Sequence, residues 1–175
     1  MSTHPLWRPF EVPDDDAIAR ARVGVHPRTL VEVVAPDERW PAQFDAVRRL
    51  VLDTLGDAVV AVEHIGSTSV PGLWAKPIVD IDLTVPDSAD EASYLPALEN
   101  AGFHLRVREP DWEEHRLFKL LEPDTNLHVF SPGAVEPQRH LLFRDWLRTH
   151  ADDREAYAAC KRDLTWVTRL GCVGS

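Results

Sequence analysis

The chain has 175 residues, of which 44% are hydrophobic and 27% are charged, so it fits one folded domain and not a collagen-like, coiled-coil or largely disordered protein. Its 29 acidic and 19 basic residues give a formal net charge of −10. Such a chain repels phosphate backbones, so we expect no long nucleic acid as a partner, and an anionic ligand would need a local cationic pocket or divalent metal ions.

The predicted organisation is an N-terminal extension over residues 1–28 and one domain over residues 29–175. The extension contains one short helix-like run, residues 16–23, which Gly24 ends. Within the domain, a short alternating run over residues 30–36 precedes apolar residues at helical spacing. These predict an amphipathic helix from Trp40 to Leu55, ended by Gly56, with Pro41 in its first turn.

Two β-branched runs, residues 59–66 and 77–85, predict strands. Ser88 and Glu91 resemble a capping box and Gly102 a stop signal, so a helix is expected over residues 88–101, kinked or divided by Pro96. Residues 104–108 are a further candidate strand. The sequence therefore predicts an α/β (α+β) fold, a small mixed sheet with flanking helices.

A hairpin is expected around the turn formed by residues 122–125. A tight turn would pair Leu120 with Leu127, Phe118 with Val129, and Lys119 with His128. After it come two helices with a break near His150, and the first carries an apolar stripe made of Leu142, Phe143, Trp146 and Leu147.

The segment from residue 64 to residue 85 contains most of the candidate site residues. Asp80 and Asp82 alternate with Ile81 and Leu83, so both carboxylates project from one face of the predicted strand. Side-by-side carboxylates repel each other, and either solvent or a bound divalent cation relieves that repulsion.

The dipeptide Gly66-Ser67, followed by Thr68, ends the preceding strand. Small residues let backbone N–H groups and a hydroxyl approach a phosphate, although the same residues also suit an ordinary turn. A phosphate loop beside a carboxylate pair is what phosphoryl or nucleotidyl transfer requires.

The order Gly66-Ser67, then Asp80-x-Asp82, resembles the polymerase-β-like nucleotidyltransferase superfamily, and the string EHIGSTSVPGLWAKPIVDIDLTV resembles the GrpB family within it. The similarity runs from about residue 31 to about residue 164. It implies that Gly66, Ser67 and Thr68 hold phosphate and that Asp80 and Asp82 bind Mg²⁺ or Mn²⁺. The implied reaction transfers a nucleoside monophosphate from an NTP to a small-molecule or protein acceptor.

Active members of the superfamily commonly carry a third carboxylate on a later strand, whereas this sequence has Asn126 and His128 there. His128 could replace the acid as a general base or ligand. Alternatively, the domain binds a nucleotide without catalysis, as an accessory module linked to coenzyme A biosynthesis or protein assembly, since some GrpB-like domains are fused to dephospho-coenzyme A kinase.

Five basic residues are candidates for the triphosphate or, alternatively, for surface ion pairs. They are Lys76, Lys119, Arg139, Arg144 and Lys161. No zinc, nucleophile-elbow, Rossmann or P-loop motif occurs. The two cysteines, Cys160 and Cys172, predict reduced thiols, and with no signal-peptide or membrane-spanning pattern they favour the cytoplasm.

Overall fold

A computed structural model describes residue 6 and residues 14–24 and 32–170 of the chain. It contains a five-stranded sheet in the order β1-β2-β5-β4-β3, in which β2 and β5 are parallel and the other neighbours antiparallel. The strands are β1 (Ala61–Ile65), β2 (Val79–Thr84), β3 (His104–Glu109), β4 (His115–Leu120) and β5 (Thr125–Phe130). The predicted mixed sheet is confirmed.

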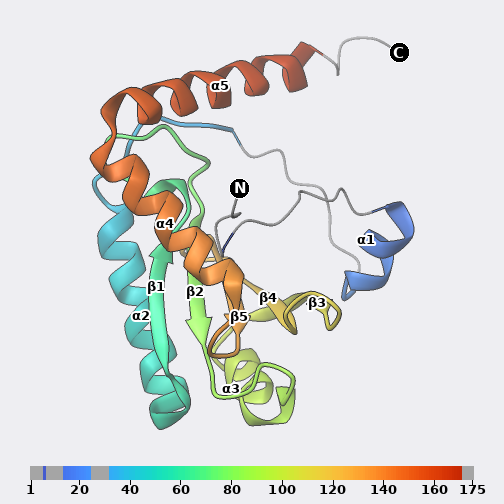
Figure 1. Cartoon of the computed structure of the whole chain (residues 1–175). Helices are drawn as coiled ribbons and strands as arrows, with labels where there is room; N and C mark the ends of the chain where they lie inside the picture. Colours follow the sequence, from blue (N-terminus) through green and yellow to red (C-terminus); the bar gives the residue numbers. More distant parts are fainter. Residues whose placement is uncertain (1–5, 7–13, 25–31, 171–175) are drawn as a thin grey trace.

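The helices are α1 (Asp15–Ala21), α2 (Trp40–Leu55), α3 (Leu95–Asn100), α4 (Val135–Thr149) and α5 (Ala151–Leu170). Figure 1 shows α2 behind β1, α3 below the lower end of β2, and α4 crossing in front of β1 and β2. One face of the sheet therefore packs against α2, and the other packs against α4. In the described ranges, none of the helices combines the length and apolarity needed to cross a bilayer.

The hydrophobic core lies between the sheet and the α2–α3 side. Ile81 and Leu83 of β2 are fully buried in it, as are Val47 and Val51 of α2. Burying each such side chain contributes about 1.5–3 kcal/mol. Because strand residues alternate, this packing directs Asp80 and Asp82 to the opposite face, which α4 covers.

The predicted helix from Trp40 to Leu55 is confirmed at both ends. Pro41 lies in the first turn, where a missing N–H costs little. Gly56 has φ +55° and donates its backbone N–H to the Leu52 carbonyl, so the helix ends where glycine tolerates a left-handed backbone.

The expected helix over residues 88–101 is wrong in its first half. Ser88 is buried, and its backbone N–H and its Oγ both contact Ser131 Oγ at 2.9 Å. Its carbonyl accepts a 2.6 Å hydrogen bond from the Tyr94 hydroxyl. Ser88 therefore serves a tertiary network instead of a cap, and α3 begins only at Leu95, with Pro96 in its first turn.

The predicted hairpin between β4 and β5 exists, but its register was wrong by two residues. Lys119 pairs with Asn126 instead of His128, Phe118 with Leu127, and Leu120 with Thr125. The connection occupies residues 121–124, so pairing begins at Thr125. A shift of two keeps every side chain on its predicted face.

Part of the N-terminal extension attaches to the outer edge of the sheet. The expected helix exists as α1, but it ends at Ala21 and not at Gly24, because Arg22 is already extended and bridges to β3. The Asp14 carboxylate caps the helix by accepting the Ala17 N–H at 2.7 Å. Val23 then donates its N–H to the Arg106 carbonyl of β3 at 2.8 Å. The proposed boundary at residue 28 lies outside the described residues and stays a prediction.

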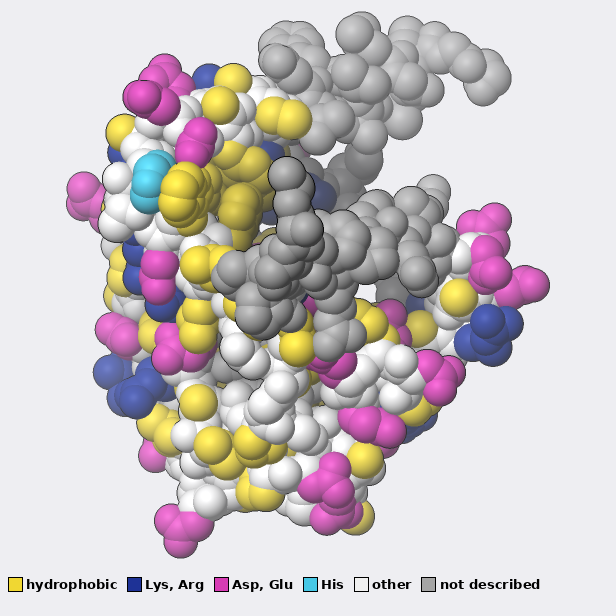
Figure 2. All heavy atoms as spheres, in the orientation of Figure 1, with side chains coloured by type: hydrophobic (Ala, Val, Ile, Leu, Met, Phe, Trp, Pro, Cys, Tyr) yellow, Lys and Arg dark blue, Asp and Glu magenta, His cyan; other side chains and the backbone are white. Residues whose placement is uncertain are grey.

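The break between the last two helices is confirmed at His150. The apolar stripe of α4 is only partly buried, because Leu147 packs inside while Leu142, Phe143 and Trp146 are about half exposed. Figure 2 shows hydrophobic side chains gathered on this face of the molecule. Cys160 is exposed and free, whereas Cys172 lies outside the described residues.

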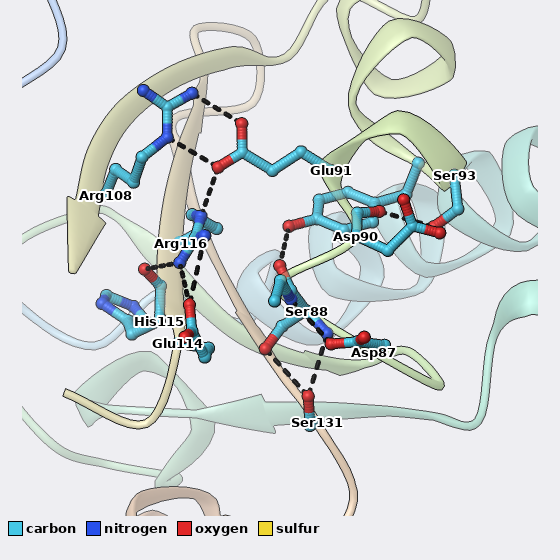
Figure 3. A network of polar contacts seen from close by, with 12 residues as sticks. Asp87, Ser88, Asp90, Glu91, Ser93, Arg108, Glu114, His115, Arg116 and Ser131 are labelled. Carbon is cyan, nitrogen blue, oxygen red and sulfur yellow. Dashed lines mark hydrogen bonds and ion pairs between the residues drawn. The ribbon is translucent and has the colours of Figure 1, made fainter. Parts of the chain in front are cut away.

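A charged network joins the α3 region to β3 and β4 (Figure 3). Arg116 is 4% exposed, and its guanidinium donates to Glu91 at 2.5 Å and to Glu114 at 3.3 Å. Glu91 also forms a bidentate pair with Arg108, with both contacts at 2.6 Å. The hydrogen bonds from Arg108 lower the pKa of Glu91, and those from Arg116 add to this.

Glu91→Gln should lower the free energy of unfolding by roughly 2 kcal/mol, because it removes one of two carboxylates from the buried Arg116 while Glu114 remains. A lowered carboxylate pKa stabilises the fold above the unfolded pKa, and this contribution is lost as the pH falls below about 4. Urea unfolding from pH 3 to 7 should show a flatter acid limb in the variant. The exposed Asp90→Asn is the control; equal behaviour of the two variants would contradict the account.

Candidate functional site

Parallel pairing of β2 with β5 sets four polar residues side by side. Asp80 lies opposite Asn126, and Asp82 lies opposite His128. Asn126 donates from Nδ2 to Asp80 Oδ1 at 2.8 Å. Burial raises the pKa of Asp80, against the hydrogen bond from Asn126 and the charges of nearby lysines. The sequence prediction that both aspartates share one face is confirmed by this arrangement.

The loop after β1 closes directly over Asp80. Gly66 has φ +67°, and a Cβ built on it would lie 2.5 Å from Asp80 Oδ2. Only glycine fits both this backbone and this contact. Ser67 follows at the start of a short 3₁₀ turn, Ser67–Ser69, and its Oγ contacts Nζ of Lys161 from α5.

The side chain of Thr68, which was predicted to hold phosphate, makes its hydrogen bonds within the protein. It is buried and donates its hydroxyl to the Ile78 carbonyl at 3.1 Å, so the 3.1 Å contact with His64 Nε2 must be a donation from the histidine. Burial, together with Arg148 and Arg144, lowers the pKa of His64 to about 4. Thr68 thus fixes the loop and the strand to each other.

Asp82 is the more buried aspartate, at 3% exposure. Its Oδ2 accepts a hydrogen bond from His140 Nδ1 of α4 at 2.9 Å, while its Oδ1 is buried and has no hydrogen-bond partner among the described residues. Burial lowers the pKa of His140, but the hydrogen bond and charge of Asp82 outweigh it and raise the pKa overall. An unpaired buried carboxylate oxygen is costly, so it marks a place for a cation or a donor.

His128 of β5 belongs to a hydrogen-bonded series of three side chains. Its Nδ1 lies 3.0 Å from Nε2 of His115, whose Nδ1 lies 2.7 Å from Glu109 Oε2. Burial, together with the smaller effects of His115 and His140, lowers the pKa of His128 to about 3, so the ring is neutral at physiological pH.

Asp80, Asn126, His128 and His140 line a pocket of about 330 Å³ between the sheet and the terminal helices, whereas Asp82 is not among its lining residues. Asp80, Asn126 and His128 form a polar floor, and Phe143, Leu147 and Tyr157 form an apolar wall. The rings of Phe143 and Tyr157 meet edge to face with centroids 5.3 Å apart. A polar floor with an apolar wall is typical of small-molecule sites, and the volume is at the lower end of their range.

The five predicted cations are distributed unequally. Lys161 reaches Ser67 in the pocket, and Arg144 lines the pocket while donating to Glu63 and to the His64 carbonyl, both at 3.0 Å. Lys119 donates to Asn126 Oδ1 at 3.1 Å and pairs with Asp124. Of the five, Arg144 alone is a lining residue of the pocket. Lys76 is exposed, and Arg139 pairs with Glu136 at 3.1 Å.

Sequence reasoning missed His140, Glu109 and His115. His140 stands four residues after Glu136 and four before Arg144, which places all three on one face of α4. Since Arg144 was already a candidate site residue, this helical spacing could have indicated from the sequence that His140 lies on the same face. Glu109 and His115 pair across β3 and β4, and no local pattern indicates that contact.

The donor set fits Mg²⁺ bound together with a nucleotide. Among the described residues, no group of three His, Cys, Asp or Glu side chains has the geometry of a metal centre. Asp80 and Asp82 supply two carboxylates, one of which has an unpaired oxygen. Mg²⁺ typically uses one or two carboxylates and completes its shell with waters and substrate phosphates.

Comparison with known proteins identifies the family. The GrpB protein family matches residues 30–169. The chain belongs to the GrpB family. Its fold resembles the crystal structure of the conserved protein GrpB from Enterococcus faecalis, with a TM-score of 0.68 and 26% identity over 78% of this chain and 84% of that one. Membership of the nucleotidyltransferase superfamily is consistent with these matches.

Two curated relatives bear on function. A UPF0157 protein of Halalkalibacterium halodurans is 57% identical over 128 residues, which cover 73% of this chain and 66% of that protein. A protein named dephospho-CoA kinase from Mycolicibacterium paratuberculosis is 32% identical over 162 residues, covering 77% of this chain and 40% of that protein. The chain therefore spans about two thirds or less of the length of these relatives.

Substituting Gly66 should damage the GrpB site sterically. Gly66→Ala places a methyl group against Asp80 Oδ2 and forces φ +67° on an L-residue, so we expect a loss of about 1–3 kcal/mol. Gly72→Ala is the matched control, because Gly72 has φ +77° but nothing within 4 Å of its added Cβ. Chemical denaturation should show the larger loss for Gly66→Ala; equal losses would assign the effect to the backbone alone.

Asp80→Asn should leave the ligand-free protein within about 1 kcal/mol of the wild type, or above it. The raised pKa of Asp80 means that the folded state holds its proton more tightly, so the free energy of unfolding falls as the pH rises through that pKa. The asparagine variant should lack this fall. Thermal unfolding across pH 4–8, with exposed Asp111→Asn as control, measures it; a loss of several kcal/mol would make Asp80 a structural residue.

Proposed function

We propose that this GrpB-family protein is a Mg²⁺-dependent nucleotidyltransferase that moves a nucleoside monophosphate from an NTP to a small-molecule or protein acceptor. One observation carries the proposal: the Gly66 loop lies against Asp80, next to Asp82 with its unpaired buried oxygen. A phosphate loop and a carboxylate pair in contact are the two parts that positioning and charge neutralisation require.

The Gly66-Ser67 loop would hold the triphosphate. Gly66 lets the backbone pass close to the carboxylates, and Ser67 Oγ is a hydrogen-bonding group at the edge of the pocket. Lys161 already contacts Ser67, so its ammonium would face the same phosphates. Burial lowers the pKa of Lys161, which shows that its charge lacks full solvation and gains from a nearby anion.

Asp80 and Asp82 would hold the metal. When bound, Mg²⁺ supplies electrostatic stabilisation of the phosphate under attack. Asp82 Oδ1 would provide one direct contact, and His140 holds the other oxygen of that carboxylate at 2.9 Å. Asn126 similarly orients Asp80. Each metal-binding carboxylate is thus fixed by a neighbouring side chain, as in well-organised metal sites.

The pocket separates the acceptor end from the phosphate end. His128 lies beside Asp82, away from the Gly66 loop beside Asp80. A hydroxyl placed between Asp82 and His128 would be held next to the metal-bound phosphate. The apolar wall from α4 and α5, including Phe143 and Tyr157, would pack against the base or the acceptor and exclude water.

A non-catalytic role is the second candidate, and two observations favour it. The β5 strand carries His128 where active superfamily members carry an acid, and the chain aligns with 40% of a relative named dephospho-CoA kinase. In that case the pocket binds a nucleotide and the domain acts as an accessory module in coenzyme A biosynthesis or protein assembly.

The test combines binding with turnover. ATP with Mg²⁺ should raise the melting temperature more than either alone, because a ligand bound by the folded state stabilises it. Incubation with α-labelled ATP, Mg²⁺ and cell extract should then label an acceptor. Asp82→Asn should abolish both effects, while Asp111→Asn should preserve them.

The outcomes separate the two candidates. A thermal shift with labelling supports the transferase. A shift without labelling supports the accessory module. The absence of any shift with ATP, GTP, CTP or UTP, in protein whose folding is confirmed by circular dichroism, would remove nucleotide binding and both proposals with it.

A further inference from the structure

Three side chains from three adjacent strands form a continuous hydrogen-bonded chain that ends in the pocket. Glu109 of β3 contacts His115 Nδ1 of β4 at 2.7 Å, and His115 Nε2 contacts His128 Nδ1 of β5 at 3.0 Å. His128 lines the pocket, whereas the Glu109 side chain is 35% exposed. This hydrogen-bonded series of side chains therefore connects the pocket floor to solvent.

With Glu109 ionised and both histidine rings neutral, the two hydrogen bonds fix where the protons lie. An ionised Glu109 can only accept, so His115 carries its proton on Nδ1. A neutral His115 then has a lone pair on Nε2, and His128 must donate to it from Nδ1. His128, neutral in turn, is left with a lone pair on Nε2, and Nε2 has no hydrogen-bond partner among the described residues.

The middle of the chain is held firmly. The His115 ring is 4% exposed and stacks on Phe130 at a centroid distance of 4.8 Å, with Trp112 against it edge to face at 5.0 Å. The His115 and His128 rings are themselves stacked at 5.2 Å. In Figure 3 the His115 ring points away from Arg116, whose guanidinium contacts the His115 backbone carbonyl at 3.2 Å and not the ring.

We propose that Glu109 and His115 are positioning residues that keep His128 in its Nδ1–H form, so that its Nε2 lone pair accepts the hydroxyl proton of the acceptor substrate. The inference rests on the proposed transferase function and narrows its acceptor to a hydroxyl compound. A positioned base accelerates an amine or thiol acceptor less, since an alcohol is the group that most needs its proton removed.

The proton transfer balances along the chain. The acceptor O–H bond breaks as its oxygen bonds to the α-phosphorus of the NTP, and the proton forms a bond to His128 Nε2. The α–β phosphoanhydride bond breaks in the same step, and pyrophosphate leaves with its electron pair. The Nδ1–H proton of His128 moves to His115 Nε2, and the Nδ1–H proton of His115 moves to Glu109 Oε2. Glu109 ends protonated, both rings end neutral in the other tautomer, and Glu109 releases the proton to solvent.

The hydrogen-bonded series explains how the buried, weakly basic ring of His128 could act as a general base. A lone His128 would have to store a positive charge in a site that disfavours it. A relay to Glu109 avoids that charge, because the proton gained on one side of each ring is matched by one lost on the other. The partly exposed carboxylate at the end is the group that is able to exchange with water.

Nitrogen-15 NMR of histidine-labelled protein without nucleotide tests the tautomer directly. Long-range correlation spectra should show His128 protonated at Nδ1 and unprotonated at Nε2, with the signals assigned by loss in His128→Gln and His115→Gln. A proton on Nε2 of His128 in the wild type would overturn the inference.

Glu109→Gln provides the second test, since a glutamine amide both donates and accepts and no longer fixes the proton on His115. We expect an Nε2–H signal of His128 to appear in this variant. The exposed Glu99→Gln on α3 is the matched control and should keep the wild-type spectrum. An unchanged His128 spectrum in Glu109→Gln would show that Glu109 does not set the tautomer.

Turnover supplies the third test in the labelling assay. Glu109→Gln should lower kcat by roughly ten- to hundredfold while KM changes by less than about twofold, because the chain acts on proton transfer and not on binding. An unchanged kcat would overturn the relay. The NMR arm is measured in the resting protein, so a failure of the proposed function, seen as absent labelling, is distinguishable from a failure of the tautomer assignment.

Discussion

The parallel pairing of β2 with β5 is the constraint on which the rest of the site depends. It aligns Asp80 with Asn126 and Asp82 with His128, while the alternate residues of the same strands fill the core under α2. A strand buried on both faces is usually apolar throughout. Here one face is apolar and the other is polar, which is tolerated because neighbouring side chains hydrogen-bond its polar groups: Asn126 bonds Asp80, His140 bonds Asp82, and His115 contacts His128.

One buried oxygen on this polar face is informative. Asp82 Oδ1 is buried without a hydrogen-bond partner among the described residues, although Oδ2 of the same carboxylate is well bound by His140. Leaving a charged oxygen unsatisfied costs about 1–3 kcal/mol or more. Near it, Gly66 lies in a left-handed conformation against Asp80. Unfavourable features concentrated at one spot are typical of binding sites, where the ligand relieves them.

Local patterns predicted those elements whose stability is local. The helix from Trp40 to Leu55 is amphipathic, has proline in its first turn and ends at glycine, and both ends were correct. The region from Ser88 to Leu95 failed because Ser88 contacts Ser131, a residue 43 positions away, and no nearby pattern reports that contact. The β4–β5 register failed for a smaller reason, since the turn residues fix which strand residues pair first.

The same distinction applies within the site. Gly66, Ser67, Asp80 and Asp82 stand close in sequence and could be recognised as a motif. His140 and Glu109 reach the site from α4 and β3, so only the tertiary fold brings them there. His128 could be chosen from the sequence, but its hydrogen-bond partner and its neutral state depend on burial and on His115. The sequence motif thus identifies the candidate ligand-contacting groups, whereas the groups that hydrogen-bond to them are found only from the structure.

Charge balance explains why a histidine can stand where an acid is common. A third carboxylate next to Asp82 would add negative charge to a region where burial already raises the pKa of Asp80. Two carboxylates carry at most two negative charges, which one divalent cation neutralises. A neutral His128 keeps that balance and, through His115, moves the remaining acid to Glu109 at the edge of the sheet. The Glu109 carboxylate is then separated from Asp80 and Asp82 by two imidazole rings and lies where water can solvate it. It stays connected to the pocket through hydrogen bonds alone.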